Sequence, residues 1–253
     1  MRILKRAGVT QLVECDLAKV DVAGSNPVSR SIRPNPSRQS TMVISIMRKL
    51  LFSFLLATAV FAQYKSEPAG APPADVAPDI GKALEQQGAK IVAGNGSAFC
   101  EVWFRSSLPA GAKSAGEGVT LPAIQHGTLL GIIRFAGPGA DRRGQSIKPG
   151  VYTLRYSLQP VNGDHLGVSP QRDFLVMVPA ADDKDLNATP DFDALMAMSR
   201  KASGTPHPAV LSMWAAGAGD AAGFAKQGEN DWVLTTKIGG TPVSVILVGK
   251  AEG

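Results

Sequence analysis

Between residues 63 and 253 the chain consists of short apolar or alternating runs separated by turn signals, and this pattern restricts it to a mainly β fold. The clearest run follows Lys148-Pro149-Gly150, where Pro fixes one φ angle and Gly allows a positive one. One face of residues 151–158 carries Tyr152, Leu154, Tyr156 and Leu158, and the other carries Val151, Thr153, Arg155 and Ser157. Such alternation is typical of an antiparallel strand with one buried and one solvated face.

The same criteria predict further strands at 90–93, 98–105, 118–123, 128–135, 174–178, 209–214, 231–238 and 242–248. Asn95-Gly96 separates the first two of these strands, and Gly239-Gly240 separates the last two. Both dipeptides are signals for tight hairpins. Residues 217–228, rich in Gly and Ala, are predicted to be a loop or a poor helix.

Two helices are predicted. Asp79 can cap a short helix that runs through residues 84–87 and stops at Gly88. Thr189-Pro190-Asp191 opens a longer one with an N-cap hydroxyl, a Pro and an acidic first turn, and Gly204 ends it. The predicted fold class is therefore mainly β: an antiparallel β-sandwich with one short and one longer helix, with a partly open β-barrel as the alternative.

Residues 47–62 have the organisation of a signal peptide. Met47-Arg48-Lys49 is a short positive segment, residues 50–62 are apolar, and Val60-Phe61-Ala62 provides the small residues of a cleavage site. The apolar run is too short to span a bilayer as a helix. The cleavage point also lacks a Cys to which a lipid could be attached. We expect export to the periplasm or the exterior, with no stable membrane anchor after cleavage.

Residues 1–46 are expected to be a disordered, mis-annotated leader, with the true start codon at Met47 or, at the earliest, at Met42. Within it, residues 7–31 resemble the translation of a glycine tRNA gene, because Gly24-Ser25-Asn26-Pro27 matches the bases of a T-loop. The predicted organisation is then this leader, the signal peptide 47–62, a Pro/Ala-rich tether over 63–78, and a single domain over 79–253.

The basic charge of the chain belongs to its first part. Of the 26 Lys and Arg residues, nine lie before residue 63 together with three acidic residues, which leaves 17 basic and 18 acidic residues from Gln63 onward. Binding to nucleic acid requires clustered positive charge on the folded domain. The composition therefore argues against a nucleic-acid partner.

The segment 162–173 contains the strongest candidate catalytic residues: Asp164, His165, Ser169 and Arg172. They fall in the connection between two predicted strands, where functional sites often lie. Adjacent Asp and His do not by themselves provide the geometry of a catalytic triad, and the chain has no Gly-x-Ser-x-Gly elbow. The competing interpretation is a turn-rich loop in which Asp164 and Arg172 satisfy backbone groups and each other.

No cofactor or metal site is predicted. His126, His165 and His207 are isolated in the sequence and lack the spacing of metal ligands. Residues 183–187 begin like a calcium loop, but the positions that require Gly and Glu hold Ala188 and Ala194. We interpret this segment as a solvated acidic loop that precedes a helix.

Cys100 is the one cysteine beyond the signal peptide, so residues 63–253 contain no disulfide of their own. It shares strand parity with Val102 and Phe104, which predicts a buried core position rather than a reactive thiol.

Lys148 to Leu154 resembles a phrase found in many extracellular β-sandwich modules, and the chain from Gln63 is similar to secreted bacterial β-sandwich proteins. That resemblance covers seven residues, and it implies a turn and a strand without assigning any catalytic residue. We expect an exported, soluble, non-enzymatic protein that is a binding or structural module for an unknown ligand or protein partner. The alternative is a periplasmic hydrolase or metal-dependent enzyme that uses the loop from Asp164 to Asp173.

Overall fold

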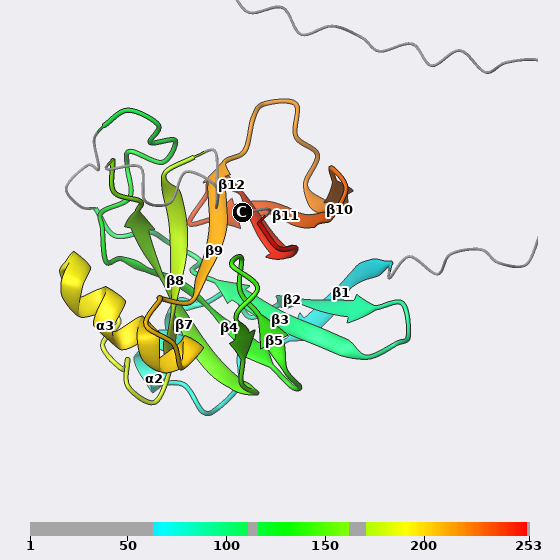
Figure 1. The fold of residues 1–253 in the computed structure, drawn as a ribbon, viewed down its shortest axis with the longest axis horizontal. Coiled ribbons are helices and arrows are strands. Elements are labelled where there is room, and N and C mark those ends of the chain that lie inside the picture. Colours follow the sequence, from blue (N-terminus) through cyan, green and yellow to red (C-terminus); the bar gives the residue numbers. More distant parts are fainter. Residues whose placement is uncertain (1–62, 111–115, 162–170, 252–253) are drawn as a thin grey trace, which may run out of the picture. The chain divides into compact units, whose positions relative to one another are not determined.

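One large antiparallel sheet organises the computed structural model, which describes residues 63–110, 116–161 and 171–251 (Figure 1). Its ten strands lie in the spatial order β1 (Tyr64–Gly70), β2 (Gly88–Ala93), β3 (Ala98–Phe104), β4 (Leu129–Phe135), β7 (Gly150–Leu158), β8 (Asp173–Pro179), β9 (Val210–Ala215), β12 (Thr241–Val248), β11 (Asp231–Ile238) and β10 (Gly223–Gln227). A separate two-stranded ladder joins β5 (Gly139–Ala140) and β6 (Ser146–Ile147). The helices of the described residues are α2 (Pro78–Ala83) and α3 (Phe192–Ser203). The predicted mainly β fold with one short and one longer helix is confirmed.

The sheet curves until its two edge strands, β1 and β10, approach each other. Each of these strands has a hydrogen-bonded neighbour in the sheet on one side only. The ring centroid of Tyr64 in β1 lies 5.7 Å from that of Trp232 in β11, and Trp232 stacks on Phe224 in β10 at 5.6 Å. We call the junction between β1 and β10 the seam. The sheet is therefore nearly a barrel, and both the expected sandwich and the alternative partly open barrel fit it.

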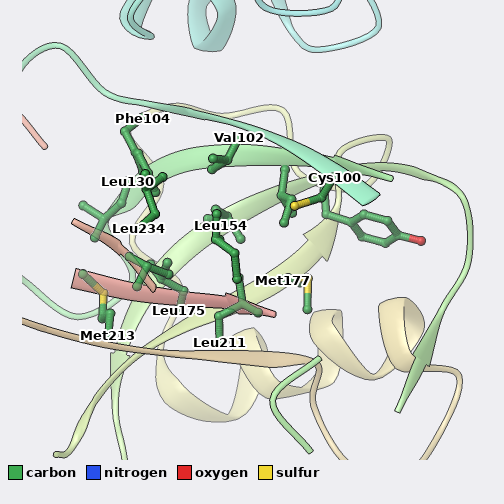
Figure 2. Close-up of a cluster of buried hydrophobic side chains, with 14 of the residues drawn as sticks. Cys100, Val102, Phe104, Leu130, Leu154, Leu175, Met177, Leu211, Met213 and Leu234 are labelled. Carbon is green, nitrogen blue, oxygen red and sulfur yellow. The ribbon is translucent and has the colours of Figure 1, made fainter. Parts of the chain in front are cut away.

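The concave side of the sheet encloses the main hydrophobic core. Figure 2 shows side chains from strands far apart in the sequence converging there: Cys100, Val102, Phe104, Leu130, Leu154, Leu175, Met177, Leu211, Met213 and Leu234. Cys100 has an exposed fraction of 1%, as its strand parity predicts. Burial raises the pKa of its thiol, which therefore stays protonated and behaves as a small apolar side chain.

Two smaller apolar clusters lie outside this core. One comprises Ile80 of α2 with Trp103, Leu129 and Ile132 of the sheet, and the other comprises Leu195 and Met196 of α3 with Phe174, Val176 and Val178 of β8. Each helix therefore covers part of the sheet's outer face. This double coverage explains why β8 is apolar along most of its length rather than alternating.

Helix α3 is capped at both ends. The Asp191 side chain accepts a hydrogen bond from the Ala194 N–H at 2.8 Å, and Gly204 adopts the left-handed conformation at the end of the helix. Its N–H donates to the carbonyl oxygen of Arg200. The end at Gly204 agrees with the prediction, whereas the N-cap falls two residues after Thr189 because the Asp191 carboxylate makes the capping bond.

The predicted tether over 63–78 is wrong. Residues 64–70 form β1, which pairs with β2 from Tyr64↔Ala93 to Gly70↔Gly88. Pro68 is compatible with this strand because β1 lies at a sheet edge, where one side makes no ladder. The folded domain therefore begins well before residue 79.

Three other local predictions need correction. Residues 118–123 form turns rather than a strand, and the segment 217–228 contains β10. Helix α2 ends at Ala83, because Leu84 is extended and forms a bridge with Arg105 of the neighbouring chain segment. The expected leader and signal peptide, residues 1–62, lie outside the described residues.

Candidate functional site

The candidate loop can be followed at its C-terminal end. Asp164, His165 and Ser169 lie outside the described residues. Arg172 is described, and its Nε donates to the carbonyl oxygen of Gln159 at 2.8 Å while Nη1 donates to that of Glu117 at 3.3 Å. Arg172 therefore joins two chain segments through their carbonyl groups, as the structural interpretation of this loop requires.

Asp173, the residue after Arg172, is fully buried at the start of β8. Its carboxylate accepts hydrogen bonds from the N–H (2.7 Å) and Oγ1 (2.9 Å) of Thr120, from the Leu121 N–H (3.1 Å) and from the Tyr156 hydroxyl (2.6 Å). These bonds tie residues 120–121 to β7 and β8. The backbone N–H groups that Asp173 binds are not available to a strand ladder, which explains why 118–123 is irregular.

Arg155 lies on the face of β7 that the alternation predicts to be solvated, yet its exposed fraction is 0%. All five guanidinium N–H groups can be assigned partners. Nε and Nη2 bind the two carboxylate oxygens of Asp183, each at 2.7 Å. Nη1 donates to the carbonyl oxygens of Gly127 (2.7 Å) and Ala188 (2.5 Å), and Nη2 also donates to that of Asp185 (2.7 Å).

The acidic segment 183–187 exposes Lys184, Asp185 and Asn187, as expected for a solvated loop before a helix, but its first residue is an exception. Asp183 is buried, and its carboxylate also accepts a hydrogen bond from Thr153 Oγ1 at 2.5 Å. A buried ion pair is tolerated when the remaining donors and acceptors are satisfied, and here the guanidinium satisfies three backbone carbonyls as well. Arg155 thus fixes the connection between β8 and α3 against the sheet.

His126 lies beside this network. Its Nδ1 is 3.2 Å from Ser157 Oγ, and its ring centroid is 6.2 Å from that of Phe192 at the start of α3. Its Nε2 is buried and has no hydrogen-bond partner among the described residues. His207 lies in the loop after α3, where its backbone groups bind Thr205 and Ser203. Among residues 63–110, 116–161 and 171–251, no group of three His, Cys, Asp or Glu side chains is placed to hold a metal.

A small apolar cavity of about 30 Å³ lies beneath α3, lined mainly by Phe174, Phe192, Met196 and Val210. It has room for about one water molecule. The volume is too small for a cofactor.

A larger groove, of about 680 Å³, lies near the seam, between the residues that precede β2 and those that precede β10, and we call it the seam groove. Glu85 and Gln87 line it next to Gly88, which pairs with the last residue of β1. The opposite wall comes from the segment that precedes β10 and from the end of β11, which pairs with the start of β10. The full lining is Glu85, Gln87, Ala216, Gly217, Ala218, Asp220, Ala222, Thr235, Thr236, Lys237 and Pro242. The aromatic contact of Tyr64 and Trp232 closes one end of the seam.

The lining of the seam groove combines small residues with hydroxyl, amide and charged groups of both signs. Ser66 and Pro68 share the strand parity of the core-facing Tyr64 but are exposed, so the concave side of β1 is accessible beyond the aromatic contact. Sequence reasoning missed this groove because its walls come from three distant segments, none of which carries a motif.

Comparisons with protein-family models, with curated proteins and with solved structures give no match for this chain. In the described part of the chain, no helix is long and apolar enough to cross a membrane.

The neighbouring carboxylates Asp182 and Asp183 allow a matched test of the Arg155 network. Asp183→Asn leaves the buried Arg155 without its counter-charge and should lower the free energy of unfolding by about 3–5 kcal/mol. Asp182→Asn removes an exposed pair with Lys201 and should cost at most about 1 kcal/mol. Urea denaturation of both variants measures the difference, and equal losses would contradict the assigned role of Arg155.

Proposed function

We propose that the chain is exported and that the part beginning at Gln63 is a soluble binding or structural module. The observation that carries this proposal is the position of β1. The first strand of the described residues begins at Tyr64, two residues after Ala62, the last residue of the predicted signal peptide. Cleavage after Ala62 would release the folded part with its first strand intact.

The contacts of Tyr64 support this cleavage point over one further downstream. Its ring packs edge-on against Phe99 and Trp232, with both pairs of centroids 5.7 Å apart. Removal of residue 64 would delete the ring that links β1 to the other edge of the sheet. Removal of the chain through Ala62 preserves it.

The seam groove supports the binding role. Its polar lining of Glu85, Asp220 and Lys237, together with two threonine side chains, suits a small polar ligand or a polar protein segment. The net side-chain charge of −1 from Gln63 onward disfavours nucleic acid as that partner.

The alternative is a hydrolase or metal-dependent enzyme that uses the loop from Asp164 to Asp173. Two charged residues of this loop are described, Arg172 and Asp173. Both form hydrogen bonds with backbone groups or neighbouring hydroxyls, and these bonds hold the adjoining loops in place. This use of both side chains favours the module over the enzyme.

Export can be tested by expression from Met47 in a Gram-negative bacterium. We expect the protein in the periplasm or the medium, with Gln63 as its first residue. The double variant Leu55→Arg, Leu56→Arg places two charges in the apolar run and should keep the uncleaved chain inside the cell. Cell fractionation and mass spectrometry of the N-terminal peptide measure both outcomes. An uncleaved, cytosolic wild-type chain would contradict export.

Binding can be tested by thermal unfolding with amino acids, dipeptides, monosaccharides and disaccharides as probes. At least one class should raise the Tm, because a ligand at 100 times its Kd stabilises the folded state by about 2.7 kcal/mol. Ala222→Trp fills the seam groove and should abolish the rise, whereas Ala197→Trp at an exposed position of α3 should preserve it. No rise with any probe, or an equal loss in both variants, would contradict binding in this groove.

A further inference from the structure

We propose that Gln63 is a modification site: once its α-amine is freed, it cyclises to pyroglutamate and caps the strand that closes the seam. This inference rests on the export and cleavage proposed above. It adds a chemical end to the mature chain and gives that end a structural role.

Gln63 is placed suitably for cyclisation. It is exposed, it precedes the first paired residue of β1, and among the described residues no hydrogen bond holds its side-chain amide. Its backbone lies against the turn after β2, because a Cβ atom at Gly94 would be 3.2 Å from the Gln63 carbonyl oxygen and 3.4 Å from its nitrogen. The backbone is thus located by the fold while the side chain remains free to approach the amine.

The reaction needs no other reactant. The α-amine nitrogen attacks the side-chain carbonyl carbon Cδ, so that the N–Cδ bond forms and the Cδ–Nε2 bond breaks. Ammonia leaves with a proton that the amine has given up. The five-membered lactam contains N, Cα, Cβ, Cγ and Cδ of Gln63. The backbone carbonyl carbon of Gln63 lies outside the ring. The peptide bond to Tyr64 is therefore unchanged, and the ladder of β1 is preserved.

Cyclisation alters the end of the chain in two ways. It removes the positive charge of the terminus, and it removes the free amine that an aminopeptidase requires. The next residue is Tyr64, whose ring contacts Trp232 across the seam. A blocked Gln63 therefore protects the residue on which closure of the sheet depends.

Mass spectrometry of the exported wild-type protein tests the modification. The N-terminal peptide should begin at residue 63 and be lighter by one ammonia than its encoded mass. Gln63→Ala is the matched control and should retain an amine that reacts with an amine-specific reagent. A wild-type peptide that begins at Gln63 with a free amine would overturn this inference alone. A different first residue would overturn the cleavage site and the inference with it.

Exposure to an aminopeptidase tests the protective role. The wild-type protein should keep Tyr64, whereas Gln63→Ala should lose residues 63 and 64 and then unfold at a lower Tm. Intact-mass measurement follows the trimming, and thermal unfolding follows its effect. Equal resistance of the two proteins, or trimming of the wild type, would show that the cap does not protect the seam.

Discussion

The fold depends on the enclosure of one apolar interior by a single curved sheet. Ten antiparallel strands surround side chains that come from both ends of the described sequence, and each strand is positioned by its neighbours. The enclosure is incomplete between β1 and β10, where the ring contact of Tyr64 with Trp232 replaces a strand ladder. The seam groove lies near this junction, between residues that precede β2 and residues that precede β10.

Buried polar groups position the connections around this sheet. Arg155 holds the segment between β8 and α3 through Asp183 and three carbonyl groups, and Asp173 holds residues 120–121 at the other face of β7. Both networks begin on neighbouring strands in the middle of the sheet. These two central strands therefore carry the polar side chains that hold both connections in place.

Local patterns predicted the strands that alternate or are bounded by strong turns, such as residues 151–158 and the hairpin at Gly239-Gly240. They did not predict the burial of Arg155, because alternation separates two faces without indicating what covers the outer one. Strand β1 was missed because its Pro and Gly residues have low strand propensity, which pairing with β2 overrides. The sequence also located the candidate loop before β8. It did not predict the hydrogen bonds of Arg172 and Asp173, because their partners lie far away in the chain.

Amide hydrogen exchange of the protein that begins at Gln63 tests most directly whether Tyr64 closes the sheet. In Tyr64→Ala, protection should fall in β1 and β10, which meet at the seam, while β7 and β8 remain protected because each keeps a paired strand on both sides. Unchanged protection of β1 and β10 in this variant, or an equal loss in every strand, would contradict the account.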